Sequence, residues 1–196
     1  ILRAEPEDPS SLRVVHEGEG ALYPVDFSAD GKKLVVQQYI SITKSRIFTL
    51  DVETGDWAEF NPDDDVAYSG AALLSDGDIL TVNDKNSEFR NLVRYDGETG
   101  EATVYTSDIN WDVSSWDVAA DESKVVFTVN EGGLGTIRLL DLATGEISAG
   151  PDLPVGIAGG VTFSPDGSQV GFTFNGATTP TDAWTFDVAT MELTQW

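Results

Sequence analysis

Short runs of hydrophobic residues recur along the chain, and residues that form turns separate them. Four of these runs have the length and the β-branched or aromatic content of buried strands, namely Leu34–Gln38, Ile79–Val82, Val125–Val129 and Val170–Phe174. A hydrophobic content of 40% with 19 Gly and 8 Pro fits a globular chain of many short strands. The pattern therefore predicts an all-β fold.

A turn-forming segment repeats at a fixed interval and organises these strands. Leu50–Gly55, Tyr95–Gly100 and Leu140–Gly145 each contain a strand-ending Asp that is followed four residues later by Gly. The three glycines are 45 residues apart. A period in the forties that is carried by strand and turn residues is typical of β-propeller blades, which contain four antiparallel strands each.

We therefore predict a partial β-propeller of about four four-stranded antiparallel blades, with no second domain. The blades are expected at about residues 22–60, 70–105, 115–148 and 160–196. Within residues 1–21, Leu12–His16 is expected to form the last strand of a preceding blade. The chain begins with Ile-Leu-Arg and not with Met, so we expect it to be a piece of a longer protein.

Two turns depart from the repeated pattern. The Asp of each hairpin accepts backbone N–H groups, and the Gly supplies a left-handed residue. In the fourth repeat Met191 replaces this Gly, and we expect that turn to be built differently because Met adopts a positive φ only at a cost. The turn Ala120–Ser123 of the third repeat also lacks a Gly.

The chain is strongly acidic. It carries 34 acidic against 11 basic residues, a formal net charge of −23. Such a surface repels nucleic acid phosphates and anionic lipid head groups, so we expect neither nucleic acid nor a membrane as a partner. The acidic residues are spread over every repeat, which favours adaptation to high salt over a dedicated face for cationic ligands.

Metal and cofactor chemistry has little support in the composition. The chain has no Cys, which excludes disulfides and thiolate sites, and a single histidine, His16, which we read as a partly exposed strand residue. Asp63-Asp64-Asp65 has oxygens that could bind calcium, but it lacks the spaced ligands and the Gly of a calcium loop, so a solvated link is favoured. We expect no cofactor and no metal site.

Several motifs resemble those of a known family. Phe163–Gly167, together with the Leu-Asp-Leu-Ala-Thr-Gly hairpin that ends at Gly145, resembles TolB-type propeller repeats, and Phe27–Gly31 is an altered second copy of the first element. The whole chain resembles the propeller of the prolyl oligopeptidase family of serine peptidases. A polar loop at Gly176–Asp182 that leads into Trp184–Val188 is similar to a blade of that kind.

The resemblance is to the non-catalytic half of these enzymes. It implies a domain that gates the access of peptide substrates to a Ser-Asp-His triad on a separate α/β-hydrolase domain, and that contacts this domain. No Gly-x-Ser-x-Gly motif occurs here, and Gly145–Gly150 is one residue out of register with it. We therefore predict no catalytic residue and no peptide hydrolysis by this chain alone. The alternative is a stand-alone propeller scaffold that binds a protein partner.

Strand parity predicts which loops carry function. In a four-stranded meander the short Asp-Gly and Thr-Gly turns lie on one face, and the second-to-third loops and the blade links lie on the other. We expect the latter, among them Ile40–Arg46 and Asn130–Thr136, to be longer and to carry the functional contacts.

Five polar residues on this loop face are candidates for contacts to a substrate or to the hydrolase domain. Asn83, Asn130 and Asn175 each leave the second strand of a blade, where a local hydrogen bond that eases the chain into the loop is the favoured role. Glu88 and Arg90 lie in the longest second-to-third loop. They form either a surface ion pair or a contact to a peptide terminus or the hydrolase domain.

Four blades leave two flanks of a ring exposed. Exposed apolar flanks favour association. We expect two copies to form a homodimer that closes a ring of about eight blades, or the flanks to be covered in another way.

Overall fold

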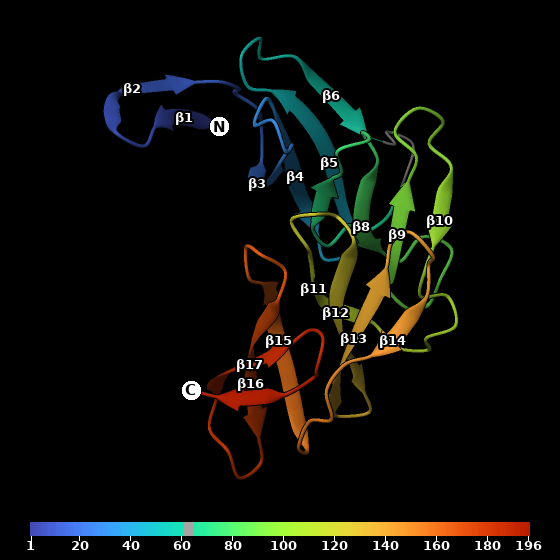
Figure 1. Cartoon of the computed structure of the whole chain (residues 1–196). Coiled ribbons are helices and arrows are strands. Elements are labelled where there is room, and N and C mark those ends of the chain that lie inside the picture. Colours follow the sequence, from blue (N-terminus) through green and yellow to red (C-terminus); the bar gives the residue numbers. More distant parts are fainter. Residues whose placement is uncertain (61–64) are drawn as a thin grey trace. The chain divides into compact units, whose positions relative to one another are not determined.

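The computed structural model describes residues 1–60 and 65–196 of the chain (Figure 1). Their regular structure consists of eighteen β-strands, β1 to β18, and none of these residues is helical. This part of the chain consequently offers no helix that could cross a bilayer. It forms two compact units, Ile1–Thr106 and Ser107–Trp196.

The first unit contains two blades, in each of which every strand pairs with the next one along the chain. The strands of blade 1 are β3 (Ala21–Phe27), β4 (Lys33–Ser41), β5 (Lys44–Asp51) and β6 (Trp57–Phe60). The strands of blade 2 are β7 (Ala71–Leu73), β8 (Ile79–Asn83), β9 (Asn91–Tyr95) and β10 (Ala102–Val104).

The central strands of blade 1, β4 and β5, are buried on both faces. Val35 and Ile47 belong to a core cluster that blade 1 shares with Ile79 and Val93 of blade 2. Successive side chains of a strand point to opposite faces, so the neighbours Leu34 and Leu50 belong to a second cluster on the outer face. Burial on both faces explains why these strands read as nearly continuous hydrophobic runs.

The start of the chain differs from the expectation of a single strand. An antiparallel hairpin of β1 (Leu2–Glu5) and β2 (Asp8–Val14) precedes blade 1. Arg3 and Arg13 face each other across it; Arg3 forms an ion pair with Glu53, and Arg13 Nη2 donates to the Val52 carbonyl at 2.8 Å. An isolated two-stranded hairpin is marginal in water, so these distant contacts explain why the polar sequence forms strands.

His16 follows β2 instead of lying in a strand. Its ring is half-buried and stacks on Trp57, with 3.9 Å between ring centroids and an interplanar angle of 6°. Trp57 stacks in turn on Phe48, at 4.3 Å. The histidine therefore joins the segment after the hairpin to the outer face of blade 1.

The second unit repeats the same plan. The strands of blade 3 are β11 (Val113–Val118), β12 (Lys124–Glu131), β13 (Leu134–Asp141) and β14 (Ile147–Ala149). The strands of blade 4 are β15 (Gly156–Phe163), β16 (Gln169–Gly176), β17 (Asp182–Asp187) and β18 (Leu193–Gln195). Four antiparallel sheets of four strands each confirm the predicted fold class.

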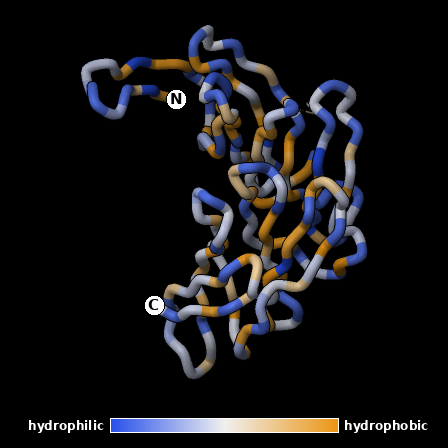
Figure 2. The backbone as a smooth tube through the Cα atoms, in the orientation of Figure 1, coloured by the Kyte–Doolittle hydropathy of each residue, from blue (hydrophilic) through white to orange (hydrophobic). Residues whose placement is uncertain are grey.

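The core of the second unit lies between its two blades. Leu139 of blade 3 and Phe172, Phe174 and Phe186 of blade 4 are buried in one cluster. Figure 2 shows the hydrophobic stretches in the central strands and the hydrophilic residues at the turns. A sheet that packs against neighbouring sheets needs hydrophobic residues in its central strands, whereas its turns face the solvent.

The fourth hairpin turn corrects one expectation, because it is built like the other three. Met191 has a φ of 59°, and its N–H donates to the Asp187 carbonyl at 2.8 Å, as Gly145 N–H does to Asp141 at the same distance. The Asp187 carboxylate accepts the N–H groups of Ala189 and Thr190, at 3.0 and 2.8 Å. These bonds, and the packing of the Met191 side chain against the core, offset the backbone strain.

The departing turn of the third repeat also keeps its geometry. Glu122 has a φ of 55°, and its N–H donates to the Ala119 carbonyl at 2.8 Å. In the first repeat Gly31, with a φ of 68°, donates to the Ser28 carbonyl at 2.8 Å. The surrounding sheet therefore fixes the turn even where the sequence lacks glycine.

The loop lengths correct a second expectation. β4 and β5 are joined by Ile42 and Thr43 alone, and β12 and β13 by Gly132 and Gly133 alone, so most of Ile40–Arg46 and Asn130–Thr136 is strand. Paired strands continue as long as both edges can exchange backbone hydrogen bonds, and polar side chains do not stop them. The longer second-to-third loops are residues 84–90 in blade 2 and 177–181 in blade 4.

Candidate functional site

Asn83 is the most buried of the five predicted contact residues. It is the last residue of β8 and is 1% exposed. Its Oδ1 accepts the Lys85 N–H at 3.0 Å, and its Nδ2 donates to the Tyr95 hydroxyl at 3.2 Å. Both bonds lie within blade 2 and hold the start of the β8–β9 loop.

Asn130 and Asn175 are exposed and lie in the last two residues of β12 and β16. Asn130 Oδ1 accepts the Gly133 N–H at 2.8 Å, and Asn175 Nδ2 donates to Thr181 Oγ1 at 2.7 Å. These two amides are therefore engaged with their own loops, as Asn83 is.

Glu88 and Arg90 lie in the β8–β9 loop, which ends just before Asn91, the first residue of β9. Glu88 is exposed and Arg90 is half-buried. The loop is held by Asn91, whose Nδ2 donates to Ser87 Oγ and to the Phe89 carbonyl, both at 3.0 Å. Of the five predicted residues, the structure brings together Asn83, Glu88 and Arg90 at one end of blade 2.

Repeated carboxylates form the other polar feature, on the side of the short turns. In each hairpin turn the Asp carboxylate accepts backbone N–H groups. The N–H of the Thr three residues later is the main cause of a lowered pKa at four of these carboxylates, Asp51, Asp96, Asp141 and Asp187. Asp166 has its pKa lowered to about 2, mainly because the Ser164 hydroxyl donates to it. Hydrogen bonds to the charged form explain these shifts.

The described residues contain no group of three or more His, Asp or Glu that could hold a metal ion. Asp65 forms an ion pair with Lys44, with 2.6 Å between Oδ1 and Nζ. Asp63 and Asp64 of the candidate calcium segment lie outside the described residues.

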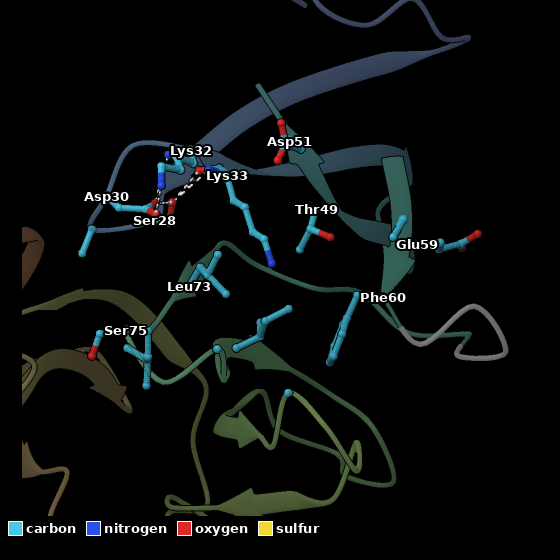
Figure 3. Close-up of a pocket in the computed structure, with 16 residues that line it drawn as sticks. Ser28, Asp30, Lys32, Lys33, Thr49, Asp51, Glu59, Phe60, Leu73 and Ser75 are labelled. Carbon is cyan, nitrogen blue, oxygen red and sulfur yellow. Dashed lines mark hydrogen bonds and ion pairs between the residues drawn. The ribbon is translucent and has the colours of Figure 1, made fainter. Parts of the chain in front are cut away.

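The structure also brings together residues that the sequence analysis does not single out. Lys33, Thr49 and Leu73 line a hollow of about 530 Å³ between blades 1 and 2, on the side of the short turns (Figure 3). None of the five predicted contact residues lines it. An alignment of the repeats gives a sequence signal for this hollow, because Thr49 occupies the position that Leu139 has in blade 3.

Comparisons with solved structures support the fold. The chain is similar to a prolyl endopeptidase, with a TM-score of 0.79 and 17% identity over 96% of this chain and 28% of that one. A puromycin-hydrolyzing peptidase of Mycobacterium tuberculosis gives a TM-score of 0.80 and 13% identity over 96% of this chain and 31% of that one. TolB of Acinetobacter baumannii gives 0.71 and 17%, over 94% and 45%. These identities establish likeness of fold alone.

The chain spans less than half the length of each of these three structures. No curated protein matches it. The family described as prolyl oligopeptidase, N-terminal beta-propeller domain, matches residues 7–196, which is nearly the whole chain. On this match, and with the four-bladed architecture described above, the chain belongs to the N-terminal β-propeller domain family of prolyl oligopeptidase.

Proposed function

We propose that this chain is the non-catalytic propeller portion of a prolyl oligopeptidase-like serine peptidase. In this role it gates the access of peptide substrates to a hydrolase domain of the same protein and contacts that domain. The observation that carries the proposal is the family match over residues 7–196, in a sequence without a Gly-x-Ser-x-Gly motif.

The β8–β9 loop supports a contact role for one end of blade 2. Its residues 84–90 are anchored at both ends, by Asn83 and by Asn91. Glu88 is exposed between these anchors. A loop that is held at its base presents a charged side chain in a defined place, which suits recognition of a peptide terminus or of a neighbouring domain.

The first experiment asks whether the chain is part of a serine hydrolase. The native protein is labelled in cell extract with a fluorophosphonate probe, and the labelled polypeptides are identified by peptide mass spectrometry. We expect peptides of this sequence in a labelled polypeptide much larger than 21.1 kDa. An unlabelled polypeptide close to that mass would contradict the proposal and favour the stand-alone scaffold.

The second experiment tests gating in the purified native enzyme. Cleavage rates are compared for a short peptide, for longer peptides with the same cleavage site, and for an unfolded protein that contains it. We expect the rate to fall steeply with substrate length. Equal rates for all three substrates would mean that the propeller does not gate access.

A further inference from the structure

The hollow between blades 1 and 2 lies wholly within the first unit. Blade 1 contributes Thr49 and Phe60, and blade 2 contributes Leu73 and Ile79. The turns Ser28–Lys32 and Ser75–Gly77 border the same hollow. Its volume of about 530 Å³ falls within the range of small-molecule pockets.

A difference between the repeats contributes to this space. In blade 3, Leu139 pairs with Val126 and Ser148, and it is 4% exposed in the core between blades 3 and 4. The equivalent residue of blade 1 is Thr49, which pairs with Val35 and Ala58 and is half-buried. Thr has one side-chain heavy atom fewer than Leu, so it fills less of the space between its blades than Leu139 does, and it places a hydroxyl at the wall of the hollow.

The same comparison shows a change in charge pairing. Lys124 of blade 3 faces Asp141 in register, with 3.8 Å between Nζ and Oδ2. Lys33 faces Asp51 in register and its charge is one of the smaller causes that lower the pKa of Asp51, yet among the described residues no carboxylate lies within ion-pair distance of its ammonium. Figure 3 shows that its side chain extends into the hollow, between Leu73 and Thr49.

The other charged groups at the hollow are already engaged. Lys32 pairs with Asp30 at 3.7 Å, and Glu59 pairs with Arg46 at 3.3 Å. Asp51 Oδ1 accepts the N–H groups of Glu53 and Thr54, at 2.9 and 2.8 Å. Lys33 thus presents a positive charge beside an apolar floor, in a chain whose net charge is −23.

We propose that this hollow binds a small carboxylate with an apolar body, with Lys33 as the anion-binding residue. The ammonium donates to the carboxylate, and the Thr49 hydroxyl lies on the same wall to donate a second hydrogen bond. Leu73, Phe60 and Ile79 receive the apolar body. Since the acidic surface repels anions in general, binding depends on this local geometry.

The test uses the 196-residue chain and does not depend on the proposed peptidase role. N-acetyl-leucine and N-acetyl-leucinamide are titrated separately while amide chemical shifts are recorded by NMR. We expect the acid to change the amide chemical shifts of Thr49, Leu73 and Gly97 saturably. The neutral amide should bind with an affinity at least about tenfold lower. Equal binding of the two probes, or no saturable shift with the acid, would overturn the proposal.

Three variants locate the site. Lys33→Met should weaken binding of N-acetyl-leucine about tenfold, whereas its counterpart Lys124→Met in blade 3 should leave binding unchanged. Thr49→Leu should also weaken binding, because it narrows the hollow and removes the hydroxyl donor. Unfolding curves establish that each variant is folded. Unchanged affinity in folded Lys33→Met would refute the assignment of that residue.

Two further probes separate the sources of such a carboxylate. Acetyl-Ala-Ala-Leu represents the end of a peptide, and 4-methylpentanoate represents a free acid. Tighter binding of the peptide identifies a peptide carboxyl terminus as the ligand class, and equal binding identifies a free carboxylic acid. Both results support a carboxylate site, and failure of both probes to bind would overturn it.

Discussion

The Asp26 carboxylate accepts the backbone N–H of Leu73 at 3.1 Å, and so ties the first strand of blade 1 to the first strand of blade 2. The second unit contains the same contact, in which Asp117 accepts the Phe163 N–H at 2.7 Å. Asp26 lies in β3 and Asp117 in β11, and in each strand the pairing register is irregular just before the aspartate. A bulge re-aims the following side chain, which here reaches the neighbouring blade.

We expect Asp26→Ala and Asp117→Ala each to lower the free energy of unfolding by about 1–3 kcal/mol, because a half-buried N–H group loses its hydrogen bond to a charged carboxylate. Denaturant titration measures the change. Asp152→Ala, at an exposed residue between blades 3 and 4, is the control and should stay within about 0.5 kcal/mol. A loss no larger than that of the control would mean that the contact does not stabilise the pair of blades.

Acid should weaken the turn that contains Asp166. Its folded-state pKa of about 2 lies below the ordinary 3.8, so its contribution is present above the unfolded value and is lost as pH falls through the folded one. The stability difference between the unmodified chain and Asp166→Asn should therefore shrink between about pH 4 and about pH 2. Unfolding curves at several pH values measure it, with Asp152→Asn as the control. A constant difference across that range would contradict this origin.

Salt should stabilise the chain. With 34 acidic against 11 basic residues, raising NaCl from about 0.1 to about 1 M shortens the screening length from about 10 to about 3 Å and reduces self-repulsion. Thermal unfolding in this range should show a rising midpoint. Replacing the exposed Glu17 and Glu19 by Gln should reduce the salt dependence. A midpoint that falls with salt would rule out the reading of the acidic surface as salt adaptation.

The His16–Trp57 stack should hold the N-terminal hairpin in place. His16→Ala removes a ring contact worth about 1 kcal/mol, so the amides of β2 should exchange with solvent about fivefold faster. Hydrogen exchange followed by mass spectrometry measures this rate. His16→Phe keeps an aromatic ring and should preserve most of the protection. If the Ala and Phe variants exchange alike, the stack does not hold the hairpin.

We also expect two copies of this chain to associate. Leu2, Leu12 and Val14 of the hairpin are 63%, 57% and 53% exposed, and exposed apolar surface of this kind favours a contact with another copy. Light scattering in high salt, where charge repulsion is screened, should give twice the mass of 21.1 kDa. A monodisperse monomer at high protein concentration would exclude the pairing.

The sequence by itself determined most strands of the four blades, their grouping into fours and the positions of the short turns. These features are local: an apolar run such as Val125–Val129 needs only its neighbours to indicate a strand, and an Asp at the strand end forms its turn with the next four residues. Each of these local patterns occurs in several repeats, which strengthens the prediction. For this reason the fold class and the family resemblance are confirmed, even where Met191 replaces the usual glycine.

Only the tertiary structure decided the features that depend on residues far apart. The strand β1 forms because blade 1 holds Arg3 and Arg13, and the turn at Met191 is imposed by the sheet around it. The tie from Asp26 to Leu73 and the hollow beside Thr49 both require two blades to face each other. Sequence spacing places Asp26, Leu73 and Thr49 within their blades, but the packing of one sheet on the next determines what each side chain contacts.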